Sequence, residues 1–294
     1  MPDKPGIVAG KVRIGISGWT YRPWRGTFYP ARLPHRKELG YAAGLFPSIE
    51  VNGTFYGLQR PEAFGLWRSE TPDDFVFAVK ASRYITHMRK LRDVEMPLAN
   101  FLASGILRLG PKLGPILWQF PPQMKFDAER FRAFFAMLPH DTQQAIDLAR
   151  RHDERLDDRN WLQCDVEQPL RHAVEIRHES FRAPEFIELL REYNIALVCA
   201  DTVAWPRFMD LTSDFVYCRL HGSEELYVSG YDSAALDRWA ARVRTWANGG
   251  EPDDAERVLP PTAPADGRDV FVYFDNDVKV RAPADALSLT ERVR

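Results

Sequence analysis

With 294 residues, the chain is long enough for one large α/β domain or for two domains of ordinary size. Its hydrophobic fraction of 45% and its charged fraction of 27% are typical of a globular protein with a substantial core. A formal net charge of -2 argues against the broad basic surface of a general nucleic-acid-binding protein, although a local basic patch stays compatible with it.

The cysteines and the N-terminus narrow the class of protein further. None of the three cysteines forms a CxxC motif, and Cys199 and Cys218 lie in apolar, strand-like runs. We therefore expect buried thiols rather than a zinc site or a disulfide framework. Residues 1–5 lack the apolar core of a signal peptide, and no apolar run is long enough to span a membrane. These features predict a cytoplasmic protein without a membrane partner.

Eight short and almost continuously apolar segments alternate with helical patterns along the chain. The predicted strands cover residues 12–18, 48–52, 75–80, 114–120, 173–177, 195–201, 215–222 and 270–276. Helical patterns cover residues 37–45, a segment that begins at Pro61, and residues 97–109, 128–137, 142–155, 184–193, 233–247 and 283–292. Apolar strands that alternate with helices are typical of a parallel sheet covered by helices.

Eight such units favour a closed barrel over an open, doubly wound sheet. The turn after the first strand, residues 17–21 (SGWTY), is neither a GxGxxG motif nor a P-loop, which argues against a dinucleotide-binding fold. The sequence therefore predicts one TIM-like (β/α)8 barrel domain over residues 1–294. Two insertions are expected, at about residues 140–170 and at 249–267, the latter rich in Pro, Gly and Asp.

Polar side chains are concentrated where the predicted strands end. Because side chains alternate between the two faces of a strand, one phase of each strand points into a barrel. In the fifth strand this phase carries Glu175 and Arg177, two charges that need partners inside the protein. The same phase in the other strands gives Ser17, Glu50, Asn52, Thr54, Lys80, Gln119, Asp201, Tyr217, Arg219, His221, Tyr273 and Asp275.

This polar ring has two interpretations. It is either an ion-pair network that closes one end of the barrel, or a ligand pocket. The carboxyl ends of barrel strands are where barrel enzymes keep their active sites, and nearly every interior polar group of this chain falls there. We therefore favour a pocket.

With these strand ends assembled, the chain resembles the YecE-like family (domain of unknown function 72). The matching stretches are residues 15–19 (GISGW), Trp24, 28–30 (FYP), 50–56 (EVNGTFY), Lys80, 86–87 (TH), 119–122 (QFPP), 175–178 (EIRH), 219–222 (RLHG) and 273–276 (YFDN). Asp275 stands where the family pattern leads us to expect Asn. The resemblance covers nearly the whole chain and implies a TIM-like barrel, but no particular reaction.

The cations of the ring point to a small anionic, phosphorylated ligand, because the guanidinium fork suits phosphate and carboxylate groups. The expected ligand-binding residues are Lys80, His87, Arg177, Arg219, Asn52, Tyr56, Gln119, Trp19 and Asn276. If the ligand is hydrolysed, the expected catalytic residues are Glu175, His221, Glu50 and Asp201. In that scheme Glu175 or Glu50 is the general base, and His221 or His87 the general acid.

Other classes of function remain open at this point. A divalent-metal phosphodiesterase site, like that of endonuclease IV barrels, would use the interior carboxylates, but no HxH, HxxxH or HExxH spacing occurs and the interleaved cations would repel a metal. A non-catalytic module that binds nucleic acid would use basic loop residues such as Arg83 and Lys90. We expect no metal and no cofactor, and the sequence carries no signal for an oligomeric state.

Overall fold

The structure is a computed structural model of the chain and describes residues 9–222, 226–263, 266–277 and 279–294. Residues 1–5, which bear on the predicted absence of a signal peptide, lie outside the described part, as do residues 264–265 of the predicted 249–267 insertion. Within the described part, no helix combines the length and the apolar character needed to cross a membrane.

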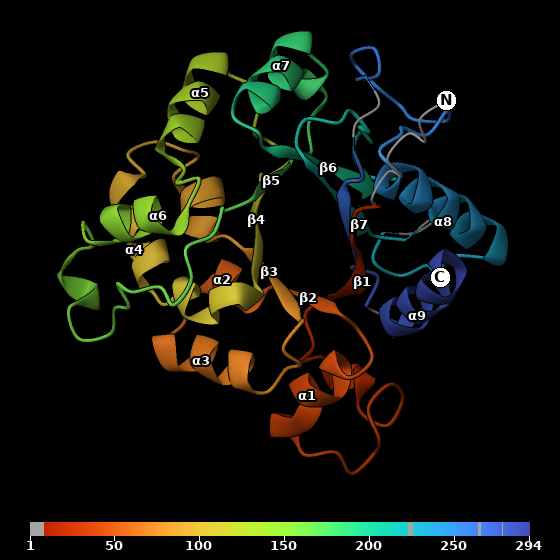
Figure 1. Cartoon of the computed structure of the whole chain (residues 1–294), viewed down its shortest axis with the longest axis horizontal. Helices are drawn as coiled ribbons and strands as arrows, with labels where there is room; N and C mark the ends of the chain where they lie inside the picture. Colours follow the sequence, from red (N-terminus) through yellow and green to blue (C-terminus); the bar gives the residue numbers. More distant parts are fainter. Residues whose placement is uncertain (1–8, 223–225, 264–265, 278) are drawn as a thin grey trace, which may run out of the picture. The chain divides into compact units, whose positions relative to one another are not determined.

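Eight parallel strands close into a barrel in sequence order (Figure 1). They are β1 (Val12–Ser17), β2 (Ser48–Val51), β3 (Val76–Lys80), β4 (Leu113–Gln119), β5 (His172–Glu175), β6 (Ala196–Asp201), β7 (Phe215–Leu220) and β8 (Asp269–Phe274). Helices follow the strands along the chain except between β6 and β7, where residues 202–214 form no helix. The fold is therefore the TIM-like (β/α)8 barrel that the alternation of apolar strands and helices predicts.

The α-helices of the described chain start at clear sequence signals. They are α1 (Glu38–Ala43), α2 (Gly53–Tyr56), α3 (Pro61–Ser69), α4 (Glu95–Ala103), α5 (Ala128–Met137), α6 (Thr142–Ala149), α7 (Pro184–Glu192), α8 (Ser233–Ala247) and α9 (Arg281–Val293). Asp127, Asp141 and Asp232 accept a hydrogen bond from a backbone N–H in the first turn of α5, α6 and α8. A proline occupies the first turn of α3 and of α7, where its missing N–H costs nothing.

Some helix ends differ from the predicted ones. The helix expected over residues 97–109 ends at Ala103, because Gly105 has a φ of 113°, and a 3-10 segment, Ile106–Lys112, follows. The helix expected over residues 142–155 ends at Ala149, and a short 3-10 turn, Glu154–Leu156, begins after it.

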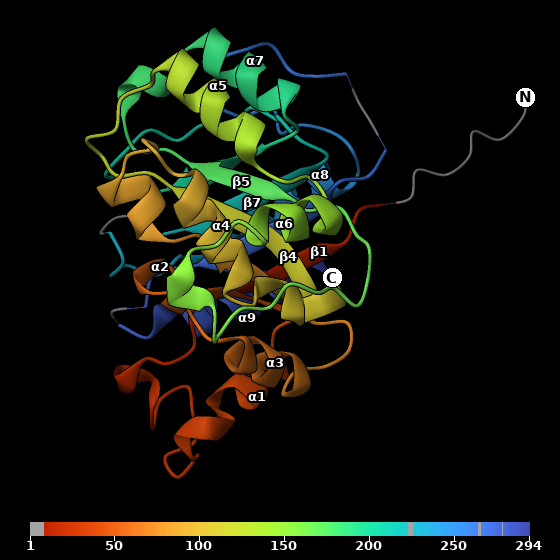
Figure 2. The same ribbon diagram turned by 90° about the vertical axis from the view of Figure 1, so that its left-hand side faces the viewer.

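By the density of its internal contacts the chain divides into two compact units, residues 17–181 and a unit of the first strand with residues 182–294. In the first, α4 packs against α6, as Figure 2 also shows. In the second, α8 and α9 pack against each other and against β8. Tryptophans are fully buried in both units, Trp118 in the first and Trp246 in the second.

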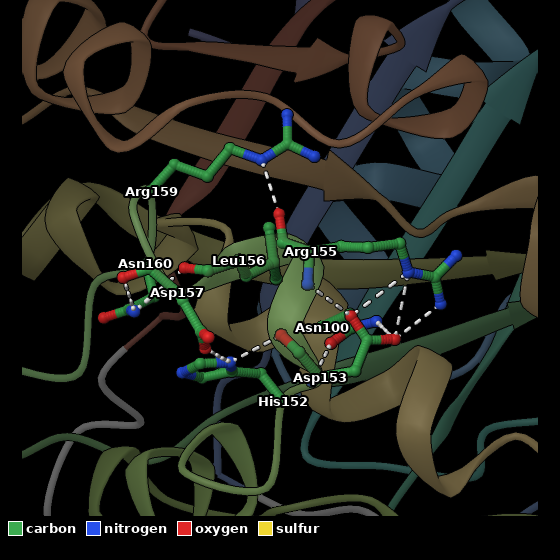
Figure 3. A network of polar contacts seen from close by, with 8 residues as sticks. All are labelled: Asn100, His152, Asp153, Arg155, Leu156, Asp157, Arg159 and Asn160. Carbon is green, nitrogen blue, oxygen red and sulfur yellow. Dashed lines mark hydrogen bonds and ion pairs between the residues drawn. The ribbon is translucent and has the colours of Figure 1, made fainter.

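The insertion over residues 140–170 is fastened to α4 by a network of polar contacts (Figure 3). The amide of Asn100 donates to Asp153 Oδ2 at 2.9 Å, and its oxygen accepts from the Asp153 backbone N–H at 3.0 Å. The Asp153 carboxylate also accepts from the backbone N–H of Arg155 at 3.1 Å and forms an ion pair with its guanidinium. These hydrogen bonds hold the pKa of Asp153 well below its usual range.

The strand register decides which side chains share a face. Gln119 lies opposite Glu175, Lys80 opposite Leu117, and Glu50 opposite Ala78. The other face of β4 carries Trp118, whose ring packs against Phe134 of α5 at a centroid distance of 5.0 Å. Trp118 is therefore a core residue under the helix layer, as its phase in the strand predicts.

Candidate functional site

A group of polar side chains gathers at the ends of β2–β5, in the unit of residues 17–181. We call this group the first cluster; its members are Ser17, Glu50, Asn52, Lys80, His87, Gln119, Glu175 and Arg177. Glu50, Lys80, Gln119 and Glu175 lie on strands or at strand ends, on the face that the alternation assigns to them.

Glu175 is fully buried and is the acceptor for two neighbours. Its Oε1 accepts from Arg177 Nε at 2.7 Å and from Gln119 Nε2 at 3.0 Å. Arg177 Nη2 also lies 2.7 Å from the same oxygen. A buried carboxylate needs a cation and hydrogen bonds of this kind, so Gln119 and Arg177 hold Glu175 in one orientation.

Glu50 is also fully buried and accepts a hydrogen bond from the hydroxyl of Ser17. The Ser17 oxygen in turn accepts from Asn52 Nδ2 at 2.8 Å. The end of β1 is thus linked through a serine to the residues at the end of β2. This short chain of hydrogen bonds gives Asn52 a defined position next to the carboxylate.

Lys80 ends β3, and its ammonium lies over the ring of Phe55, 4.4 Å from the centroid. The backbone carbonyl of Lys80 accepts from Thr54 Oγ1 at 2.7 Å, which ties the short helix α2 to β3. The ring of His87 meets Phe55 edge-on at 5.0 Å. Phe55 therefore offers an apolar surface that both the ammonium and the imidazole contact.

His87 lies on a π-helical turn, Tyr84–Met88, that directly follows β3 and its short linker. Single π-helical turns occur frequently at functional sites. After this turn, Lys90, Leu91 and Asp93 adopt positive φ angles of 49°, 65° and 48°. Non-glycine residues in this region store strain, and such strain clusters at ligand-binding and switch segments.

The surroundings of His87 disfavour the doubly protonated, positively charged form of its ring. Burial lowers the pKa of His87 to about 4, helped by the positive charges of Arg177, Lys80 and Arg83 and opposed by Glu175. Its Nδ1 lies 2.9 Å from the hydroxyl of Thr86. At neutral pH the imidazole is therefore uncharged, and it sits in a local field made positive by three cations.

A second cluster, Arg219, His221 and Asp275, lies at the ends of β7 and β8 in the other unit. Arg219 is fully buried and donates from Nη2 to Asp275 Oδ2 at 2.7 Å. The same oxygen lies 3.2 Å from His221 Nδ1. The ring of Trp205 packs edge-on against His221 at 5.2 Å. The prediction that Arg219, His221 and Asp275 point the same way is confirmed.

Asp201 is a correction to the predicted ring. Its register partner in β7 is Leu220, not Arg219, so it lies on the opposite face from Arg219. Its carboxylate accepts from Trp239 Nε1 of α8 at 3.2 Å and from Arg207 Nη1 at 3.0 Å. Asp201 thus anchors the helix layer and the loop after β6. The prediction that it points inward as a catalytic carboxylate is wrong.

The remaining predicted ligand residues have different surroundings. Tyr56 ends α2 and is 71% exposed. Trp19 packs edge-on against Trp67 of α3 at 5.4 Å. Asn276 is fully buried and donates to Asp285 of α9 at 2.8 Å and to the carbonyl of Ser229 at 3.0 Å. Tyr56 is thus exposed to solvent, whereas Trp19 and Asn276 are engaged in contacts within the protein.

The sequence predicted no role for two residues that contact predicted site residues, Phe55 and Arg207. Phe55 contacts both Lys80 and His87, and the signal for it was its position directly before Tyr56, a few residues after the second strand. Arg207 bridges Asp201 and Glu256 across a loop that looks irregular in sequence. Arg207 and Glu256 are about 50 residues apart in the sequence, and a contact over that separation leaves no local sequence pattern that would predict it.

Two carboxylates of the clusters, Glu175 and Asp275, are bonded to cations of the protein. Among the described residues, no group of three or more His, Cys, Asp or Glu side chains is placed to hold a metal. Glu175 is bonded to Arg177, and Asp275 to Arg219. The chemistry that this arrangement suits is the recognition of a charged, hydrogen-bonding ligand.

The family comparison covers almost the entire chain. The model of the family described as "Protein of unknown function DUF72" matches residues 13–294. Among curated proteins, the "UPF0759 protein YecE" of Escherichia coli is 31% identical over 144 residues, which are 42% of this chain and 50% of that protein. The "UPF0759 protein YunF" of Bacillus subtilis is 30% identical over 122 residues, 38% of this chain and 40% of that protein. These matches therefore span half or less of the relatives' own length.

Solved structures of DUF72 proteins share the fold. One from Thermotoga maritima has a TM-score of 0.67 and 23% identity, with 96% of this chain and 98% of that chain covered. One from Enterococcus faecalis has the same TM-score with 17% identity, covering 96% of this chain and 95% of that one. At these identities the likeness supports the barrel and says nothing of the ligand.

Proposed function

The chain belongs to the DUF72 family, whose description names no activity, and we propose its function from the geometry of the site: it binds a small phosphorylated ligand at the first cluster. Lys80 and Arg177 are the cations that we assign to the phosphate, and Asn52 and Gln119 are the neutral hydrogen-bonding groups beside them. The carboxyl end of parallel barrel strands is the place where this fold holds its ligands.

The observation that carries the proposal is the environment of His87. Three cations, Lys80, Arg83 and Arg177, all act on its ring, and the buried Glu175 is the carboxylate that opposes them. With Arg83 counted, three cations face the two carboxylates of the first cluster, Glu50 and Glu175, and a half-buried site with this excess of positive charge and an uncharged histidine attracts an anion. A network built only for stability would be expected to balance its charges locally, and that alternative predicts no anion binding.

Binding, rather than turnover, is what these residues support. In the unliganded protein the ring of His87 is uncharged at pH 7, because its pKa is about 4, and so it lacks the acidic proton of an imidazolium that a general acid gives to a leaving group. A bound phosphate dianion would raise this pKa by its negative charge. Hydrolysis, with Glu175 or Glu50 as general base and His221 or His87 as general acid, stays a prediction.

Titration calorimetry with inorganic phosphate and ribose 5-phosphate tests the proposal. We expect both to bind the wild type, and Lys80→Met to weaken the affinity roughly 10- to 150-fold, which corresponds to the loss of one hydrogen bond to a charged group. Methionine removes the charge that lies over Phe55 and keeps an unbranched side chain of similar length. Arg150→Ala is the matched control, because Arg150 is an exposed cation of α6 that pairs with Asp147 at 2.9 Å.

Arg219→Ala forms a separate arm of the same experiment. Sequence reasoning assigned Arg219 to the anion as well, but its guanidinium is fully buried and bonded to Asp275. A loss of phosphate affinity in this variant would extend the proposal to the second cluster. Absence of phosphate binding by the wild type, or equal binding by wild type and Lys80→Met, contradicts the proposal.

A further inference from the structure

Tyr56 presents an exposed aromatic ring at the edge of the first cluster. Its side chain is 71% exposed, a larger fraction than for the other exposed large hydrophobic residues of the described chain. It ends α2, the short helix that packs on β3, so its backbone position is fixed by regular structure. Single exposed aromatics are common on protein surfaces, and exposure alone therefore assigns no role.

The neighbours of Tyr56 connect its ring to the proposed phosphate site. Its ring stands edge-on to Phe55, with the centroids 5.1 Å apart and the planes at 89°. Phe55 also contacts the ammonium of Lys80, which lies over its ring at 4.4 Å from the centroid. Because both contacts are made by Phe55, the ring of Tyr56 and the charge of Lys80 lie within the span of one nucleotide-sized molecule.

Arg83 shows that a flat group fits over the ring of Tyr56. Its guanidinium lies over the ring, 5.9 Å from the centroid, and the side chain is exposed. A guanidinium at this distance contributes a weak cation–π attraction and leaves with little cost. Its positive charge also acts on His87, so Arg83 adds to the cations that the phosphate of a ligand in the first cluster would meet.

We propose that the ligand of the first cluster is a phosphate ester that carries a planar aromatic ring, such as a nucleoside monophosphate, and that this ring stacks on Tyr56. The inference rests on the proposed function and names its class of ligand. Aromatic side chains bind flat rings through their faces without reading hydrogen bonds, so Tyr56 would select for a planar ring rather than for one base.

Other aromatic residues near these strand ends are already engaged in the protein. Trp19 packs against Trp67, and the hydroxyl of the buried Tyr29 donates to the carbonyl of Trp19 at 2.7 Å. Tyr84 lies on the π-helical turn, is 42% exposed, and is within electrostatic reach of Arg155 in the insertion. Tyr84 is therefore a suitable control, since it carries the same side chain on the neighbouring π-helical turn.

Titration calorimetry with AMP, ribose 5-phosphate and adenosine separates the ring from the phosphate. We expect AMP to bind the wild type more tightly than ribose 5-phosphate. Tyr56→Ala should weaken AMP binding roughly 5- to 150-fold, the range reported for one base stacked on an aromatic side chain, and leave ribose 5-phosphate unchanged. Tyr56→Phe should restore AMP affinity because it keeps the ring, and Tyr84→Ala should match the wild type.

The outcomes distinguish the two proposals. If AMP and ribose 5-phosphate bind equally well to the wild type and to Tyr56→Ala, the stacking inference is overturned while phosphate binding stands. If neither phosphate compound binds the wild type, both proposals fall. If adenosine binds as tightly as AMP and Lys80→Met has no effect, the site recognises the aromatic ring alone, and the proposal of phosphate binding falls.

Discussion

His172 is a buried histidine with both ring nitrogens engaged, and it makes the fold sensitive to acid. Nδ1 lies 3.1 Å from the donor Nε1 of Trp118, and Nε2 lies 2.8 Å from the carbonyl of Pro139. This pattern requires a neutral ring that accepts through Nδ1 and donates through Nε2. Burial lowers the pKa of His172 to about 4, with His140 as a smaller contributor.

The lowered pKa of His172 sets a direction for stability. Between pH 6.5 and about 4 the unfolded chain binds a proton at this histidine that the folded protein does not, so stability falls as the pH falls through this window. We expect a loss on the order of 2–3 kcal/mol in the free energy of unfolding, measured by urea denaturation at several pH values. His172→Asn should flatten this slope, whereas His140→Asn, a change at an exposed neighbour, should retain it. Equal slopes in wild type and His172→Asn would contradict the prediction.

At the scale of single residues, the alternation of side chains along strands predicts much of the first cluster. Glu50, Lys80 and Gln119 were placed on the correct face because β2, β3 and β4 keep a regular phase up to their last residues. Asp201 was misplaced because its own strand does not reveal how it is aligned with β7. A polar residue at a strand end suits both faces, and here Trp239 on α8 supplied the partner.

At the scale of elements, the strands and long helices follow from apolar periodicity and from caps such as Asp127 and Pro184. The π-helical turn Tyr84–Met88 was missed, and so was α2, because each is too short to show a period. Both directly follow a strand and carry residues of the first cluster or its edge. The parts that sequence reasoning missed are thus the parts that shape the proposed site.

The part of the 140–170 insertion that follows α6 offers a test at the scale of elements. Asn100 of α4 makes reciprocal hydrogen bonds with Asp153, and these join the segment of residues 150–161 to the helix (Figure 3). We expect Asn100→Ala to speed hydrogen exchange in this segment roughly 5- to 30-fold through local opening, with strand peptides little changed. Asn160→Ala is the matched control, because the Asn160 amide bonds within the segment, to Leu156 and Asp157 carbonyls. Unchanged exchange in Asn100→Ala would show that the segment is held by other contacts.

At the scale of the whole molecule, the chain combines two compact units with one closed barrel. Each strand in the closed order is hydrogen-bonded to a neighbour on both sides. A barrel has no edge strands, and loss of part of it exposes unpaired backbone groups. The solved DUF72 structures share this fold over 96% of the chain. We therefore expect the two units to unfold together.

Lys112 provides the probe for this expectation. It is 5% exposed, and its ammonium donates to the carbonyls of Arg68 and Thr71, each at 2.7 Å, within the unit of residues 17–181. Lys112→Met leaves these buried acceptors without their donor and should cost about 1–3 kcal/mol. The exposed Lys125→Met is the control and should change stability by less than about 0.5 kcal/mol.

If the barrel unfolds as one cooperative structure, Lys112→Met lowers protection equally in peptides from both units. The measurement is hydrogen exchange under increasing urea, followed in peptides that cover β4 in the one unit and β7 in the other. We expect the urea midpoints of the β4 and β7 peptides to shift equally. The reason is that β4 cannot detach without opening the closed ring of strand pairs that also holds β7. A shift in β4 with none in β7 would mean that each unit is stable without the other, and that closure of the barrel contributes little to its stability.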